Sequence, residues 1–159
     1  MNGAVVCVGR LREKYWAAAA EEYLKRISRF GRLEIIEVPD LPEPPNASDA
    51  DRKKVMEKEG EQILSRIRPG DRVIALCIDA PQYASEQFAA HLAENEMRFG
   101  CRQAFVIGGS LGLSPQVLKR ADEKISFSKM TFPHQLARVI LLEQLYRACK
   151  INAGEKYHK

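Results

Sequence analysis

Short apolar runs alternate with longer segments of helical periodicity along the whole chain. The runs are rich in valine, isoleucine and leucine and are bounded by glycine, proline or charged residues, which indicates buried strands. Five strands are therefore predicted, at Ala4–Gly9, Leu33–Val38, Arg72–Asp79, Gln103–Gly108 and Lys124–Phe127. Because each strand except the last is followed by a helical segment before the next, the strands are expected to run parallel.

The helical segments carry start signals that fix where they begin. Ser48 is a predicted N-cap with Asp51 three residues later, which is the spacing of a capping box. Ser85 is likewise expected to cap a helix, and Ser114 followed by Pro115 has the order of cap and first helical residue. The first helix is predicted to run from Lys14 to about Phe30 and the last from Pro133 to about Asn152. One face of the first helix is expected to carry Tyr15, Ala19, Tyr23 and Ile27.

These elements predict one α/β domain over residues 1–159, with a parallel sheet covered by helices on both faces. The proline-rich stretch at 39–48 is expected to be a surface loop of that domain. In such sheets, ligands bind outside the carboxyl ends of the strands. Three strand ends are therefore candidate ligand sites, at Leu76–Asp79, Gly108–Gly112 and Phe127–Phe132.

Composition places the chain among soluble globular proteins, with 45% apolar and 29% charged residues. The apolar runs are too short for a membrane span or the core of a signal peptide, so a cytoplasmic protein without a membrane partner is expected. Cys7, Cys77, Cys101 and Cys149 form no CxxC pair and have no histidine at metal-ligand spacing. They are expected to be reduced, mostly buried thiols, and no metal site is predicted.

Positive charge is concentrated near the end of the chain. Residues 119–159 hold 9 of the 25 lysines and arginines but only 4 of the 21 acidic residues. An excess of this kind is found on ordinary solvated surfaces, and it is also typical of a patch that binds a polyanion such as RNA. Charge alone leaves both interpretations open.

Two of the three strand ends have compositions suited to a ligand. Gly108, Gly109 and Gly112 follow the fourth strand, where glycine permits a tight turn or a close approach of a ligand to the backbone. The stretch SFSKMTFPH at 126–134 offers hydroxyls, backbone groups and apolar side chains that suit a flat ring with polar edges, although a plain helix start would explain it too. Neither stretch is a Walker A loop or a dinucleotide fingerprint, which disfavours an ATP or nicotinamide enzyme.

The sequence resembles the RlmH family, whose members methylate N3 of a pseudouridine in large-subunit ribosomal RNA and belong to the SPOUT class. The resemblance is carried by FVIGGSLGL, by SFSKMTFPHQLARVILLEQLYRA and by the terminal GEKYHK, with further likeness in AVVCVGRLREKYW and IIEVPD. It implies a C-terminal trefoil knot that binds S-adenosylmethionine. General rules of chain topology alone would predict no knot. The implied cofactor-binding residues are Leu76, Gly108, Phe127, Ser128, Lys129, Met130, Thr131 and Phe132.

The same resemblance implies where the chemistry takes place. The family acts as a homodimer on helix 69 of 23S rRNA in the assembled 70S ribosome, and the tail of one subunit completes the site of the other. This places Tyr157 and His158 in the catalytic site, with His158 as a candidate proton acceptor, while Lys159 stands where some relatives have arginine. Arg138 is a candidate contact for RNA phosphate or a second subunit, and Lys159 is a candidate contact for the substrate RNA. His134 is a candidate contact for the ligand or for the helix start.

Two alternatives to this function stay open at the level of sequence. A SPOUT methyltransferase that acts on tRNA would share the fold and the cofactor, although such enzymes usually carry an added domain. A ribosome-binding factor without activity would share the fold alone. His91 lies far from the candidate site and is expected to be a surface or hydrogen-bonded histidine.

Overall fold

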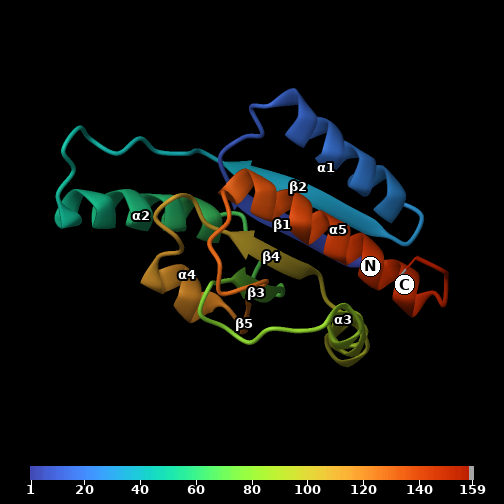
Figure 1. Ribbon diagram of the computed structural model, residues 1–159. Helices are drawn as coiled ribbons and strands as arrows, with labels where there is room; N and C mark the ends of the chain where they lie inside the picture. Colours follow the sequence, from blue (N-terminus) through green and yellow to red (C-terminus); the bar gives the residue numbers. More distant parts are fainter. Residues whose placement is uncertain (158–159) are drawn as a thin grey trace.

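Five parallel strands form one sheet in the order β2-β1-β4-β3-β5 (Figure 1). The computed structural model describes residues 1–157. The strands are β1 Asn2–Val8, β2 Arg32–Val38, β3 Arg72–Leu76, β4 Gln103–Ile107 and β5 Glu123–Ile125. The helices are α1 Lys14–Ile27, α2 Asp49–Leu64, α3 Ser85–Phe99, α4 Pro115–Arg120 and α5 His134–Asn152. The predicted α/β class and parallel sheet are confirmed, while the trefoil knot stays a prediction.

The sheet is buried on both faces, as its apolar strands predict. Along β1, Val5 and Cys7 point to one face and pack in a cluster with residues of α1, α3 and α5. Val6 and Val8 point to the other face, toward α2 and α4. Helix α5 contributes three fully buried leucines, Leu141, Leu142 and Leu145, each worth about 2 kcal/mol of burial. Within residues 1–157, no helix is long and apolar enough to cross a membrane.

Helix starts follow the sequence signals in two of three cases. Ser48 and Asp51 form the predicted capping box, with Ser48 Oγ accepting from Asp51 N at 3.2 Å and Ser48 N donating to Asp51 Oδ2 at 3.0 Å. Ser114 caps α4 through a bond from Val117 N. The prediction for Ser85 is wrong, because Ala84 precedes α3 and Ser85 Oγ instead donates to Gln144 Oε1 of α5 at 2.9 Å.

Helix α1 turns a slightly different face to the sheet from the one predicted. Tyr15 is 62% exposed and lies outside the core. Ala20 and Ile27 are buried, and Tyr23 is partly buried against the same cluster. The four alanines at 17–20 explain the error, because they leave the apolar face of this helix poorly defined in sequence.

The third strand ends three residues earlier than predicted, and this opens the candidate site. β3 ends at Leu76, after which Cys77 N still donates to Ile125 O at 2.9 Å. Residues 78–84 lie outside the strands, with a single bridge from Gln82 to Ser126, and Ile78 is half exposed. Because all five strands are parallel, the ends of β3, β4 and β5 lie at the same edge of the sheet.

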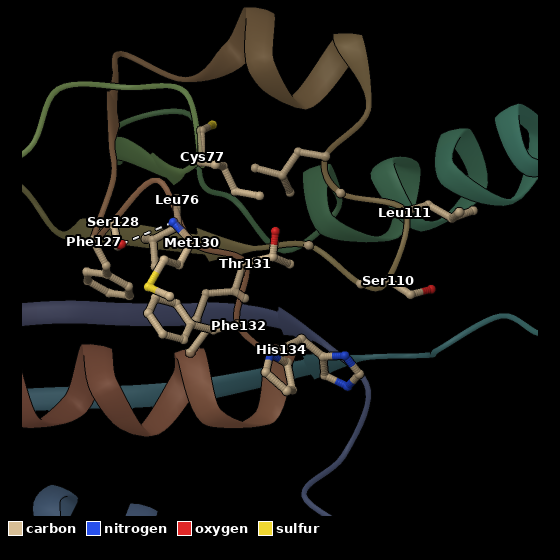
Figure 2. Close-up of a pocket in the computed structure, with 18 residues that line it drawn as sticks. Leu76, Cys77, Ser110, Leu111, Phe127, Ser128, Met130, Thr131, Phe132 and His134 are labelled. Atoms are coloured by element: carbon tan, nitrogen blue, oxygen red, sulfur yellow. Dashed lines mark hydrogen bonds between the residues drawn. The ribbon is translucent and has the colours of Figure 1, made fainter.

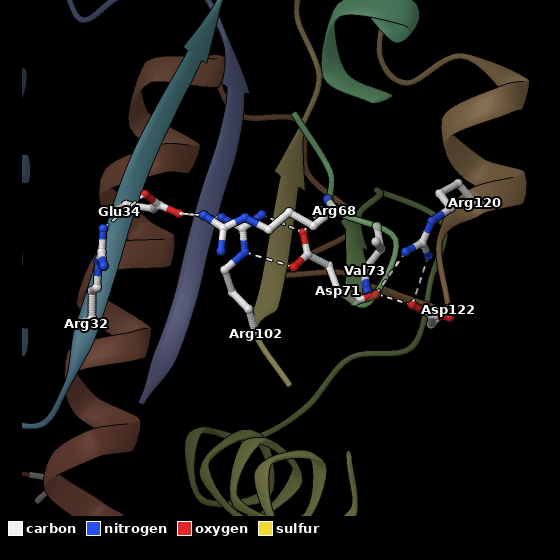
Figure 3. Close-up of polar contacts among 8 residues, drawn as sticks. All are labelled: Arg32, Glu34, Arg68, Asp71, Val73, Arg102, Arg120 and Asp122. Atoms are coloured by element: carbon white, nitrogen blue, oxygen red, sulfur yellow. Dashed lines mark hydrogen bonds and ion pairs between the residues drawn. The ribbon is translucent and has the colours of Figure 1, made fainter. Parts of the chain in front are cut away.

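The opposite edge of the sheet is held by a buried network of charges (Figure 3). The guanidinium of Arg102 binds the Asp71 carboxylate through two bonds of 2.9 and 2.6 Å and also pairs with Glu34 of β2. Asp71 also accepts from Arg68 N at 2.8 Å. Burial raises the pKa of the Asp71 carboxyl, but these bonds and the charge of Arg102 outweigh it and leave the pKa below its ordinary value.

Asp71→Asn is expected to lower the free energy of unfolding by about 3 kcal/mol at pH 7, since it leaves a buried guanidinium without its main partner. A carboxyl with a lowered folded pKa stabilises above its unfolded pKa of about 3.9 and loses that contribution as the pH falls through the folded value. The variant should therefore lose less stability than the unaltered protein between pH 5 and pH 3. Urea unfolding at both pH values checks this. Asp79→Asn, at an exposed position, is the control, and equal effects of the two changes would contradict the account.

Candidate functional site

A pocket of about 760 Å³ lies where the ends of β3, β4 and β5 meet (Figure 2). Its walls are residues 76–78 after β3, residues 107–113 after β4, and residues 127–128 and 130–134 between β5 and α5, with Ala137 of α5. These are the three strand ends that the sequence singles out. The volume is in the range of roughly 300–1,000 Å³ that small-molecule sites occupy.

The wall after β4 is a tight glycine turn. Gly112 N donates to Gly109 O at 3.1 Å, and Gly112 has a φ of +82°, a left-handed conformation that favours glycine. A Cβ on Gly108 would lie 2.7 Å from the carbonyl carbon and oxygen of Gly112. Any larger residue at Gly108 would therefore displace backbone on the pocket wall.

The wall between β5 and α5 is shaped by two serine hydroxyls. Ser126 Oγ donates to Ser128 O at 2.9 Å. Ser128 Oγ accepts from Met130 N at 3.1 Å (Figure 2). These bonds fix the turn that brings the next residues over the pocket. Met130 is 72% exposed at the mouth of the pocket, and Phe132 is partly buried. Apolar side chains with fixed backbone groups between them suit a ligand that has a flat ring with polar edges, as the sequence predicts.

The structure brings together most of the residues that the family resemblance implies. Seven of the eight predicted cofactor-binding residues line the pocket, namely Leu76, Gly108, Phe127, Ser128, Met130, Thr131 and Phe132. Lys129 is exposed and does not line it. Contact of these residues with a cofactor stays a prediction, since the geometry establishes only that they surround one cavity.

Few lining side chains carry charge. Among the described residues that line the pocket there is no aspartate, glutamate, lysine or arginine, and His134 is the one imidazole. Burial raises the pKa of the Cys77 thiol more than the charge of Lys124 lowers it, so this thiol stays protonated at neutral pH. Shape, backbone groups and the hydroxyls of Ser110, Ser128 and Thr131 must therefore position a ligand, and a proton acceptor must be His134 or come from outside this set.

The prediction that Arg138 contacts RNA is wrong for the described protomer. Its side chain is 1% exposed and lies inside the protein rather than at the surface. Arg138 Nη1 pairs with Glu37 Oε1 at 2.6 Å, and Nη2 donates to Gly9 O at 2.8 Å. Arg138 thus links α5 to the ends of β1 and β2, and its charge is not available to a polyanion.

Tyr157 packs on its own α5 and does not line the pocket. Its hydroxyl donates to Glu143 Oε1 at 3.3 Å, and its ring meets that of Tyr146 with centroids 4.9 Å apart. Burial, followed by the charge of Glu143, raises the pKa of the Tyr157 phenol. Glu143 lies six positions beyond Ala137, the last pocket residue on α5, which is about 9 Å along the helix, so Tyr157 lies away from the pocket of its own chain. His158 and Lys159 lie outside the described residues.

Sequence analysis missed a buried carboxyl behind the glycine turn. Glu59 of α2 is 3% exposed, and a Cβ on Gly109 would lie 3.2 Å from its Oε1. Burial raises the pKa of Glu59 more than the bond from Leu41 N lowers it. Nothing in the sequence distinguishes Glu59 from the other acidic residues of α2. The prediction for His91 is confirmed, because its ring contacts Glu123 and Asn95 away from the pocket.

Fold and pocket together define an α/β protein with a candidate ligand pocket across the carboxyl ends of β3, β4 and β5. The chain belongs to the SPOUT methyltransferase family, since residues 1–158 match the family described as "Predicted SPOUT methyltransferase". It is 55% identical over 159 residues to "Ribosomal RNA large subunit methyltransferase H" of Bifidobacterium animalis subsp. lactis (strain AD011), with all of both chains covered. It is 52% identical, again over the whole of both chains, to the protein of the same name from Clostridium novyi (strain NT).

A solved structure supports the fold alone. "The structure of a probable methylase family protein from Haemophilus influenzae Rd KW20" superposes with a TM-score of 0.54 at 14% identity. The match covers 98% of this chain and 70% of that one. At this identity the likeness extends to the arrangement of strands and helices and not to the substrate.

Proposed function

We propose that this protein is an S-adenosylmethionine-dependent methyltransferase that acts on N3 of a pseudouridine in helix 69 of 23S rRNA, in the assembled 70S ribosome of the cytoplasm. The observation that carries the proposal is identity above 50%, over the full length of both chains, with two proteins named as large-subunit ribosomal RNA methyltransferases. The pocket at the strand ends supports the proposal, because its volume is in the range of small-molecule sites.

The lining residues suit S-adenosylmethionine. The cofactor supplies an activated methyl group when bound, so the protein needs to provide position rather than a nucleophile of its own. Leu76, Phe127 and Phe132 offer apolar surface to an adenine ring, and the turn at Gly108–Gly112 permits close approach of the backbone. The volume of about 760 Å³ leaves room for a target nucleotide at the mouth.

The acceptor requires a proton-accepting group that the pocket largely lacks. N3 of pseudouridine is an imide nitrogen between two carbonyls and is a poor nucleophile until its proton leaves. A neighbouring imidazole is suited to remove that proton at neutral pH. His134 lines the pocket, and His158 of a second copy is the other candidate, which we propose as the base. Tyr157, next to it in sequence, would help to place the tail.

A homodimer is supported by two features of α5. Its partly exposed side includes Leu136, Val139 and Ile140, which leaves some apolar surface for another subunit to cover. Tyr157 contacts α5 at Glu143, about 9 Å along the helix beyond the last pocket residue, Ala137. A tail so placed suits a site completed by the partner subunit.

Methyl transfer from radiolabelled S-adenosylmethionine tests the proposal. The purified protein would be incubated with 70S ribosomes, free 50S subunits, naked 23S rRNA and bulk tRNA from cells that lack the enzyme. We expect label mainly on 70S ribosomes, because so small a chain must use the shape of its substrate for specificity. Label on tRNA would overturn the proposed substrate. An absence of label, together with no thermal stabilisation by S-adenosylmethionine, would indicate a binding protein instead.

A further inference from the structure

The segment from Gly9 to Lys14, which joins β1 to α1, begins at the edge of the pocket. A Cβ on Gly9 would lie 3.6 Å from Nε2 of His134, a residue of the pocket wall. In Figure 2 the blue chain that leaves β1 passes beside His134. The start of this segment therefore lies next to the pocket wall.

Two arginines of the segment point away from the protein. Leu11 packs against the main apolar cluster, whereas Arg10 and Arg12 on either side of it are exposed. Lys14, the first residue of α1, is exposed as well. Leu11 thus anchors the segment, and its two neighbours present their guanidinium groups to solvent.

Within the described part of the chain, these cations have no partner. Across residues 1–157, no ion pair or side-chain hydrogen bond joins Arg10, Arg12 or Lys14 to another residue. Some exposed arginines elsewhere in the chain, such as Arg26 and Arg52, pair with nearby carboxylates, whereas others, such as Arg66, do not pair with any described residue. The guanidinium fork matches phosphate geometry with two parallel bonds, so unpaired arginines beside an RNA-modifying pocket fit an RNA backbone.

The base of the segment is held in place by buried contacts. Gly9 N donates to Val38 O at 2.9 Å, and Arg138 Nη2 donates to Gly9 O at 2.8 Å. Arg138 is itself fixed by its 2.6 Å pair with Glu37. A segment that is ordered before binding loses less conformational entropy when it contacts its partner.

We propose that Arg10 and Arg12 bind phosphates of the substrate RNA strand beside the target nucleotide, and that buried Arg138 positions their segment. This inference rests on the proposed function and adds to it the residues that contact the RNA backbone. It also gives Arg138 a role in RNA binding that does not require contact with RNA.

The test compares two double variants that remove the same charge. Arg10→Gln with Arg12→Gln removes the proposed phosphate-binding groups, and Lys25→Gln with Arg66→Gln removes two exposed cations near the opposite edge of the sheet. For the first, we expect the KM for 70S ribosomes to rise about tenfold or more, with kcat and S-adenosylmethionine affinity within about twofold. The slope of log KM against log salt should become less steep by about 1.4, roughly 0.7 for each phosphate that the variant no longer binds. The control should stay within about twofold of the unaltered protein.

Three results would overturn the inference. Equal effects of the two double variants would mean that only net charge matters. Conversion of the Arg10/Arg12 variant to a monomer in analytical ultracentrifugation would place the segment in a subunit interface. Loss of S-adenosylmethionine affinity in that variant would mean that the arginines support the cofactor pocket. Failure of the proposed function is distinguishable from all three, because the unaltered protein would then methylate no ribosomal RNA.

Discussion

Gly108→Ala is expected to weaken S-adenosylmethionine binding at least about a hundredfold while the protein remains folded. The added Cβ would lie 2.7 Å from the carbonyl carbon and oxygen of Gly112, far inside normal contact distance. Backbone atoms cannot move aside as a flexible side chain does, so the turn on the pocket wall must shift. Overpacking of this kind costs about 1–3 kcal/mol of stability, which a domain of ordinary stability tolerates.

Isothermal titration calorimetry with S-adenosylmethionine measures this effect, and urea unfolding checks that the variant is folded. Gly70→Ala is the matched control, because a Cβ on Gly70 would meet no atom within 4 Å. The control should bind the cofactor as the unaltered protein does. If Gly108→Ala also bound the cofactor with unchanged affinity, the turn at Gly108–Gly112 would not be part of the cofactor site.

His158→Ala is expected to slow methyl transfer by about 10²–10⁴-fold, the usual contribution of a general base, with cofactor affinity unchanged. The reason is that the pocket has no carboxylate or amine among its described lining residues and the acceptor nitrogen must lose a proton. Single-turnover transfer to 70S ribosomes separates this chemical step from binding. Lys156→Ala, two residues earlier on an exposed side chain, is the control. Unchanged single-turnover transfer in His158→Ala would refute its role as the base and leave His134 as the candidate.

A mixed dimer tests whether the tail serves the other subunit. Chains with Gly108→Ala and chains with His158→Ala are each expected to be inactive alone. If the tail of one chain completes the pocket of its partner, random mixing restores one working site in each mixed dimer, about a quarter of the normal activity. If each tail served its own pocket, mixing would restore no activity.

Much of the fold follows from local sequence. The apolar runs locate all five strands to within a few residues, and the Ser48–Asp51 spacing marks the start of α2. These features are local, since they depend on burial of short runs and on bonds between near neighbours. The order β2-β1-β4-β3-β5 is not local, because a parallel strand can pair with any strand that its crossover allows.

The wrong predictions for Ser85 and Arg138 also arise from contacts between residues that are distant in sequence. Ser85 has the sequence of a helix cap, but its hydroxyl bonds Gln144, 59 positions away. Arg138 has the sequence of a surface cation, but it fills a buried position between the ends of two strands, where Glu37 and Gly9 bind its two terminal nitrogens. In both cases a partner distant in sequence determines the environment, and residue type and spacing do not identify that partner.

The location of the candidate site could be predicted from the sequence, but the chemical groups around it could be predicted only in part. A parallel sheet brings the ends of β3, β4 and β5 to one edge, so three separate stretches of sequence could be expected to share a pocket. The family resemblance added which residues are expected to face a cofactor. Neither identified Glu59, whose carboxyl is buried only because α2 packs behind the glycine turn.

Nucleoside mass spectrometry of the product RNA tests the central claim most directly. Ribosomes from cells that lack the enzyme would be incubated with the protein and S-adenosylmethionine, and the 23S rRNA would be digested to nucleosides and to mapped fragments. The account predicts about one new methyl group per 70S ribosome, found as N3-methylpseudouridine in helix 69 and absent with Gly108→Ala. A methyl group on another nucleoside, or equal methylation by Gly108→Ala, would contradict it.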